Sequence, residues 1–212
     1  MTTTASAPAF DDPASAERLN RTSAALAANG FTVDILDDVA SARVRINDLI
    51  PEGASVLTGA SETLRLSGID ADINGSGRYD AVRPRGLTMD RTTQRDEMRR
   101  MIASPDVIVG SVHAVTESGS LVIASASGSQ LVGYAGGAAH AIWVVGAQKV
   151  VPDLDTALRR IEEHCLPLEN DRVMNAFGKP SAVNRILILN ALSPEFFPGR
   201  GTVLLLREAI GF

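Results

Sequence analysis

Four short runs of continuous apolar residues constrain the fold of this chain more than any other feature of its sequence. They are "DVIVG", "SLVIAS", "HAIWVVG" and "TVLLL". A strand that is covered on both faces has this character, because neither face can carry polar side chains. Helical patterns lie between several of these runs. The alternation predicts an α/β protein in three layers, with a mostly parallel or mixed sheet flanked by helices.

The clearest helix is predicted to begin at Pro152 and Asp153, two residue types that favour a helix start. Its apolar face carries Leu154, Ala157, Leu158, Ile161 and Cys165. Further helices are predicted over 14–29, over 90–104 and from Asp37 or Asp38 onward, whereas 68–85 is expected to be irregular. Residues 1–13 are small and polar, which predicts a flexible arm, and 14–212 are expected to form one domain.

Composition narrows the possible partners. The formal net charge is −5, so no global positive field favours nucleic acid or an anionic membrane. A single cysteine, Cys165, excludes an internal disulfide or an all-cysteine cluster site within the chain. No apolar run reaches the roughly 18 residues of a membrane span. The N-terminus lacks a secretory pattern, and we expect a cytoplasmic protein.

A first candidate binding loop, "TGASET", follows the predicted strand "SVL". Ligands of α/β sheets bind at the carboxyl ends of strands, where glycine allows close approach and hydroxyls donate hydrogen bonds. Thr58, Gly59 and Ser61 are therefore candidates for binding phosphate or carboxylate. The alternative is that Ser61 only caps the following helix.

The second candidate loop lies within "VHAVTESGSLVIASASGS". His113 and Glu117 would share a face of a helix as a metal pair, but the β-rich flanks predict strand, turn and strand, so we expect no metal site. The candidate catalytic residues here are Glu117, as a general base or nucleophile, and His113, four residues before it. Equally, Glu117 could only fix the turn. The substrate-binding candidates here are Thr116, Ser118, Gly119, Ser120, Ser127 and Gly128.

Lys149 is the third catalytic candidate, since it follows the strand "HAIWVVG" and could neutralise an anionic substrate. The alternative is a solvated loop lysine. The sequence contains no GxGxxG, GxxxxGK[ST] or GxSxG motif, which disfavours nicotinamide, P-loop and α/β-hydrolase functions.

The segments "VHAVTESGSLVIAS", "AIWVVGAQKVVPDLDTALRRI", "CLPLENDR" and "PGRGTVLLLREAIGF" together resemble the LUD domain. This is the lactate-utilisation family of LutC- and YkgG-type proteins, and the similarity runs from Ala14 to the C-terminal residue. The resemblance implies a NagB/RpiA/CoA-transferase-like fold. Within that wider fold, Glu117-Ser118-Gly119 resembles the nucleophile turn of CoA transferases, and Thr58-Gly59-Ala60-Ser61 resembles the phosphate loop of sugar-phosphate isomerases.

The resemblance also implies a function. It suggests a protein that binds a small anionic metabolite in lactate or organic-acid utilisation, as a subunit or accessory of an iron–sulfur oxidation complex. No cofactor is expected in this chain, and an iron–sulfur cluster only on a possible partner subunit. Two alternatives remain open: a free-standing enzyme that transforms acyl-CoA or sugar phosphate using Glu117, and a non-catalytic scaffold. Whether the chain is an enzyme stays open.

Overall fold

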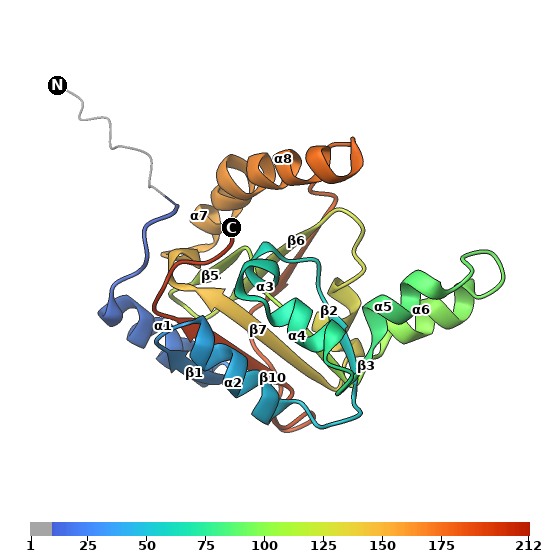
Figure 1. Cartoon of the computed structure of the whole chain (residues 1–212). Coiled ribbons are helices and arrows are strands. Elements are labelled where there is room, and N and C mark those ends of the chain that lie inside the picture. Colours follow the sequence, from blue (N-terminus) through green and yellow to red (C-terminus); the bar gives the residue numbers. More distant parts are fainter. Residues whose placement is uncertain (1–9) are drawn as a thin grey trace.

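The computed structural model describes residues 10–212, so the first nine residues of the predicted arm lie outside the described part. Two sheets and their covering helices make up the structure (Figure 1). From Phe10 onward the chain contacts the outer helices. The Phe10 main-chain oxygen lies 3.4 Å from Nη2 of Arg160, and the rings of Phe10 and His164 are 5.9 Å apart.

The main sheet has six parallel strands in the order β1-β10-β7-β4-β2-β3. The strands are β1 (Thr32–Leu36), β10 (Gly201–Leu206), β7 (His140–Gly146), β4 (Val107–Gly110), β2 (Ser55–Thr58) and β3 (Asp80–Ala81). Every residue of β4 and β10 is buried, and so is β7 after His140. The apolar runs are therefore covered on both faces, as the sequence predicts.

A second, four-stranded sheet has the order β8-β5-β6-β9. It consists of β8 (Val150–Val151), β5 (Ala114–Thr116), β6 (Leu121–Ser125) and β9 (Arg185–Leu189). β5 and β6 are antiparallel neighbours, which confirms the predicted strand, turn and strand. The run "SLVIAS" thus belongs to a different sheet from the other three runs.

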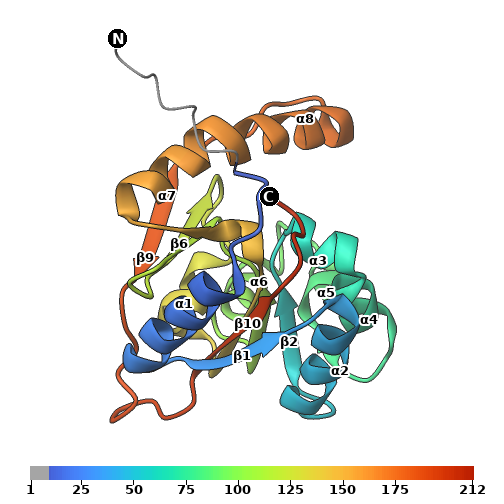
Figure 2. The ribbon, with the colours of Figure 1, turned by 90° about the vertical axis from the view of Figure 1, so that its left-hand side faces the viewer.

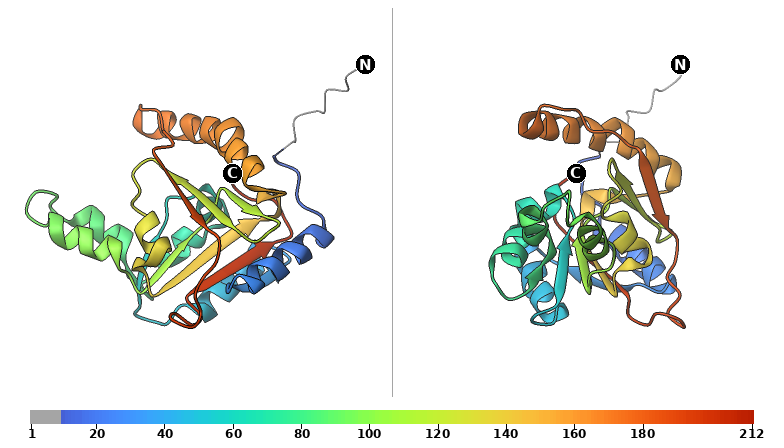
Figure 3. Two further views of the ribbon diagram at one scale, coloured as in Figure 1. Left: turned by 180° about the vertical axis from the view of Figure 1, so that it is seen from behind. Right: turned by 90° about the vertical axis from the view of Figure 1, so that its right-hand side faces the viewer.

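Helices and the second sheet cover the two faces of the main sheet. One face packs on α2 (Val39–Leu49), α3 (Glu62–Ser67) and α4 (Ile69–Gly75). The other face packs on α1 (Ala16–Ala28) and the second sheet, around the buried Trp143. α7 (Leu154–Arg160) covers the far side of the second sheet and leads toward α8 (Leu166–Phe177), as Figure 2 and Figure 3 show. The molecule is an α/β protein, as predicted.

Side-chain caps explain where several helices begin. The carboxylate of Asp38 accepts a hydrogen bond from the Ser41 amide, and that of Asp153 accepts one from the Thr156 amide, each at 2.8 Å. Both caps were predicted. A π-helical turn, Ile161–Cys165, joins α7 to α8. Along the predicted inner face, Ala157, Ile161 and Cys165 are buried, but Leu154 in the first turn is exposed.

Residues 68–85 are mostly regular, contrary to the prediction. They form α4, β3 and the first half of α5 (Val82–Thr88), and only 76–79 form an irregular stretch between α4 and β3. Gly68, at φ +75°, ends α3 and lets α4 start at once, and Ile69, Ile73 and Val82 are buried. In "NGSGR", Gly75 is the last residue of α4, whereas Gly77 lies in the irregular stretch.

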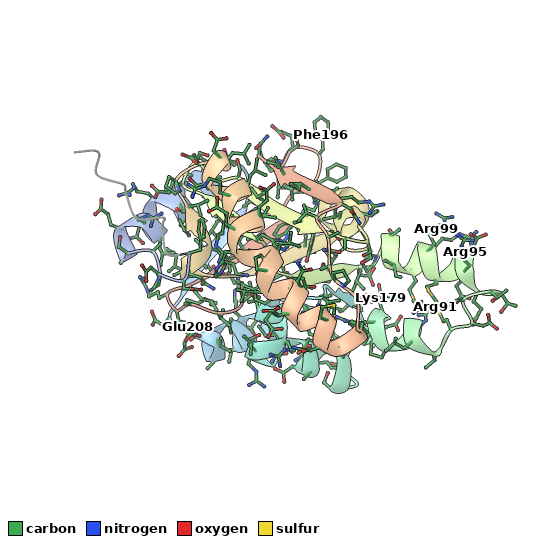
Figure 4. All side chains as sticks on the ribbon, turned by 90° about the horizontal axis from the view of Figure 1, so that it is seen from above. Arg91, Arg95, Arg99, Lys179, Phe196 and Glu208 are labelled. Carbon is green, nitrogen blue, oxygen red and sulfur yellow. The ribbon has the colours of Figure 1, made fainter. Side chains whose placement is uncertain are left out.

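α5 and α6 (Arg95–Ala103) project from the rest of the molecule (Figure 1). Arg91, Arg95 and Arg99 lie at the far end of this pair in Figure 4. The predicted inward residues Met98, Met101 and Ile102 are half-buried, and the last two pack on the main core. Over residues 10–212, the helices are all too short or too polar to cross a membrane.

Candidate functional site

A cavity with a volume of about 200 Å³ opens at the carboxyl edge of the main sheet. The loop after β2 leads to α3 on one face of the sheet, whereas the loop after β4 leads to β5 on the other face. The two loops therefore separate between neighbouring strands, which is where open α/β sheets place their ligands. Residues 59–62 and 111–113 line the two sides of the cavity.

Lys149 lies against this cavity with 1% of its surface exposed. It is in a 3₁₀ turn, η2 (Ala147–Lys149), which tucks the loop after β7 inward. The predicted alternative of a solvated lysine is thus wrong. Its Nζ has three N–H donors and lies within hydrogen-bonding distance of four oxygens, at 2.9 to 3.1 Å: Thr63 Oγ1, Ser111 Oγ, Val112 O and Phe212 O.

No Asp or Glu side chain of residues 10–212 forms an ion pair with Lys149. Burial, and after it the nearby charge of Arg160, lowers the pKa of Lys149 to about 7. Within residues 10–212 the ammonium has hydroxyl and main-chain oxygens as partners and no acidic side chain. An anion in the cavity would meet a positive charge that no Asp or Glu side chain of these residues neutralises.

Arg160 adds a second buried cation behind the cavity. Its Nη1 donates to the His113 main-chain oxygen at 2.6 Å and to Cys165 Sγ at 2.9 Å. Its Nε is buried and, among residues 10–212, lacks a hydrogen-bond partner. The sequence did not single out Arg160, because an arginine within a helix usually points to solvent.

Each of the two acidic side chains of the cavity wall forms an ion pair with an arginine of the same helix. Glu62 binds Arg65, which lowers the pKa of that carboxyl, and Glu169 binds Arg172 with Oε1 and Oε2 each 2.7 Å from a guanidinium nitrogen. These pairs leave the charges of Lys149 and Arg160 as the excess near the cavity. The site is therefore suited to a negatively charged guest.

His113 lines the cavity as a neutral imidazole. Its Nδ1 accepts a hydrogen bond from the Ala124 amide at 3.1 Å, which assigns the proton to Nε2. No side chain or main-chain group of residues 10–212 hydrogen-bonds to that Nε2. Burial lowers the pKa of His113 to about 3, with smaller contributions from Lys149 and Arg160. His113 is thus a neutral hydrogen-bond donor beside the cationic end.

The remaining wall carries hydroxyls and an amide. Ser125, Ser127 and Ser129 line it, together with Gln130, whose Oε1 accepts from Ser125 Oγ at 3.1 Å. The predicted residue Gly128 is not part of the lining, and its amide donates to Ser125 Oγ at 2.8 Å to close the turn. Ser111 and Tyr134 also line the cavity. The sequence did not indicate either of them.

In the first predicted loop, Gly59 and Ser61 line the cavity and Thr58 does not. Ser61 Oγ accepts from the Leu64 amide at 3.4 Å, so it also caps α3. The side chain of Thr58 points to the opposite side of the sheet, where its Oγ1 accepts from Asn74 Nδ2 at 3.0 Å. Strand alternation explains this, since Val56 and Thr58 share the face that packs on α3 and α4.

Glu117 lies outside the cavity, in the turn between β5 and β6. Its carboxylate accepts hydrogen bonds from Arg18 Nε at 2.7 Å and from Arg21 Nη2 at 3.4 Å, and chiefly the Arg18 contact lowers its pKa. These contacts tie the turn to α1 through arginine side chains, whereas the predicted alternative had the carboxylate bind main-chain amides of the turn itself. The catalytic role of Glu117 stays a prediction.

The rest of that turn is engaged in the same way. Thr116 Oγ1 accepts from the Ser120 amide at 2.9 Å, and Asn29 Nδ2 donates to the main-chain oxygens of Ser118 and Gly119 at 3.0 and 3.1 Å. At Gly119, φ is +85° and a Cβ would lie 2.7 Å from the Ala25 main chain. None of residues 116–120 lines the cavity. Over residues 10–212, no three His, Cys, Asp or Glu side chains come close enough to hold a metal ion.

Burial of His113 gives a prediction about stability at low pH. The unfolded imidazole has a pKa of about 6.5, so between pH 6.5 and 3 the unfolded chain binds more protons than the folded one. Stability that is complete above pH 6.5 is therefore lost as the pH falls, by about 2 kcal/mol at pH 5 from this residue. Urea unfolding of the wild type and of His113→Asn at pH 7.5 and pH 5 measures this loss.

His113→Asn is the matched comparison because its Oδ1 can accept from the Ala124 amide without titrating. His140 and His164 also have lowered pKa values, but they contribute equally to both proteins. The wild type should lose about 2 kcal/mol more than the variant over this interval. Parallel losses in the two proteins would contradict a buried neutral His113.

Comparisons with known proteins identify the family. Among curated proteins, no sequence matches this chain. A crystal structure of a DUF162 family protein from Deinococcus radiodurans superposes with a TM-score of 0.55 over 92% of this chain and 99% of that one, at 11% identity. At that identity the likeness shows the fold alone. The family model of the LUD domain matches residues 19–190. On this match, which spans most of the chain, the protein belongs to the LUD domain family.

Proposed function

We propose that this LUD-domain protein binds a small anionic metabolite in the cavity at the carboxyl edge of its main sheet. The observation that carries the proposal is the buried ammonium of Lys149, which faces the cavity and has no Asp or Glu side chain of residues 10–212 as a partner. A buried cation that no acidic side chain pairs with is costly, and an anionic guest removes much of that cost. One guest oxygen would take the place of one of the four present acceptors.

The size of the cavity supports a small guest. Pockets for drug-sized ligands start at about 300 Å³. A short carboxylate fits the smaller volume of this cavity, about 200 Å³. We place the binding in lactate or organic-acid utilisation, a context that rests on the LUD resemblance.

Calorimetric titration with lactate, glycolate, acetate and inorganic phosphate tests the proposal, at pH 6 and pH 8.5. Binding requires the charged ammonium, and the pKa of Lys149 in the free protein is about 7. The dissociation constant should therefore rise about tenfold per pH unit above 7, until the higher pKa of the bound state is reached. No binding by any of these anions at pH 6 would overturn the proposal.

We also propose that the chain acts as a subunit or accessory of an iron–sulfur oxidation complex, with the cluster on a partner subunit. Purification of a tagged full-length chain from its native host should bring down a protein with the visible absorbance of an iron–sulfur cluster. A chain that isolates alone, under conditions that preserve such clusters, would count against the complex and leave the anion site unaffected.

A further inference from the structure

The hydroxyl of Tyr134 has no hydrogen-bond partner in the part of the chain that the structure describes. Tyr134 is 1% exposed and lies in a π-helical turn, η1 (Gly133–Gly137), against the cavity. Its Oη forms no hydrogen bond with any residue of 10–212, although buried polar groups nearly always have a partner. Burial raises its pKa above the ordinary tyrosine value, so the hydroxyl keeps its proton and can donate.

Two glycines make room for this hydroxyl. A Cβ on Gly110 would lie 1.6 Å from Tyr134 Oη, and a Cβ on Gly59 would lie 3.0 Å from it. These are the last residue of β4 and the first residue after β2. The hydroxyl therefore points between the two strands where the loops separate, at the edge where the cavity opens.

The ring itself is held firmly. Its centroid is 5.5 Å from that of the buried Trp143, and Arg200 donates to the Tyr134 main-chain oxygen from Nη1 and Nη2 at 3.0 Å each. The hydroxyl cannot turn away to find another partner. Its missing partner must come from the cavity.

We infer that Tyr134 Oη and His113 Nε2 form a neutral subsite, which binds an uncharged oxygen of the same ligand whose negative charge meets Lys149. This inference rests on the proposed function and extends it. Tyr134 Oη lies beside Gly110, while Lys149 Nζ bonds to the next two residues, Ser111 and Val112. The neutral hydroxyl of Tyr134 and the ammonium of Lys149 therefore lie beside consecutive residues of the cavity wall. The ligand class is an acid that also carries a hydroxyl or carbonyl oxygen.

Tyr134→Phe is the variant that tests the subsite, because it removes one atom and keeps the ring. Wild type and variant are titrated with two pairs of acids that differ in one neutral oxygen, glycolate against acetate and lactate against propionate. The variant should lose about tenfold in affinity for glycolate and lactate. Its affinity for acetate and propionate should stay within about twofold.

The empty proteins give a second readout that needs no ligand. If Oη lacks a protein partner, Tyr134→Phe leaves no donor or acceptor unsatisfied, and its melting temperature should equal or exceed that of the wild type. A melting temperature lowered by several degrees would reveal a protein partner and overturn the subsite.

The two proposals fail differently. If the wild type binds no acid, the anion site is wrong and the subsite falls with it. If the wild type binds acids but Tyr134→Phe weakens all four equally, or none, the anion site stands and the subsite is wrong. A selective loss for the oxygen-bearing acids is the result that supports both.

Discussion

Lys149→Met should weaken the binding of a small carboxylate by about 100-fold or more. Removing one member of a desolvated, hydrogen-bonded charge pair typically costs 2–5 kcal/mol, and no other Lys or Arg of residues 10–212 lines the cavity. Arg160 lies behind the wall and is occupied by the His113 oxygen and the Cys165 sulfur. Calorimetric titration at pH 6 measures the loss.

The same substitution should not unfold the protein. The pKa of Lys149 is about 7 when folded and about 10.5 when unfolded, so keeping the ammonium buried at neutral pH destabilises the fold. Methionine is similar in length and removes that cost, while Thr63 Oγ1 and Ser111 Oγ lose a donor. We expect a melting temperature within a few degrees of the wild type, or higher.

Lys179→Met is the matched control. Lys179 is the other lysine of the chain, is exposed and does not line the cavity, so its replacement removes an equal charge without removing a buried donor. It should leave carboxylate binding unchanged. Equal losses of carboxylate affinity in the two variants would mean that the effect comes from net charge alone. An unchanged affinity in Lys149→Met would contradict the anion site.

The sequence predicted the buried strands because burial on both faces leaves a direct trace in the residues themselves. β4 is apolar throughout, and so are β7 after His140 and β10 after Thr202, while Asp38 and Asp153 cap helices at the predicted positions. These features depend on neighbours within a few residues. They could therefore be predicted without knowing what packs against them.

The position of Glu117 could not be predicted in the same way. His113 and Glu117 stand at opposite ends of β5, about 13 Å apart at the usual rise of a strand. β5 runs from the cavity to the turn, and β6 returns to the cavity at Ser125. Only the ends of the hairpin that hold His113 and Ser125 reach the site. The polar turn at 116–120 lies at the other end of the hairpin, where it contacts α1 and Asn29.

The site residues that the sequence missed come together only through tertiary structure. Arg160 belongs to a helix that covers the second sheet, and Tyr134 belongs to a glycine-rich π-helical turn. Neither the adjacent arginines Arg159 and Arg160 nor the "GYAGG" segment shows a hydrophobic periodicity that would predict burial. The unusual combination in "GYAGG" of an aromatic residue with three glycines is the one local signal of a close approach.

Gly110→Ala should destabilise the protein by about 2–3 kcal/mol, which corresponds to a fall in melting temperature of about 5–10 °C for a chain of this size. The new Cβ would lie 1.6 Å from Tyr134 Oη and 2.9 Å from Tyr134 Cζ. The aromatic ring is buried against Trp143 and cannot bend, so β4 or the π-helical turn has to move. Thermal and urea unfolding measure the change.

Gly75→Ala is the control for the general effect of replacing glycine. Gly75 lies in α4, its φ is not positive, and nothing lies within 4 Å of an added Cβ. Alanine there should leave stability unchanged or raise it by up to about 1 kcal/mol. A Gly110→Ala variant as stable as Gly75→Ala would contradict the close approach of Tyr134.

A double-mutant cycle separates the clash from other effects at Gly110. In a Tyr134→Leu background the ring and its hydroxyl are gone, so Gly110→Ala should then cost less than about 1 kcal/mol. The coupling between the two positions should be at least about 1 kcal/mol, as expected for residues in direct contact. Additive costs would mean that something other than the tyrosine excludes a side chain at the end of β4, and the glycine would not have the role of making room for the phenol.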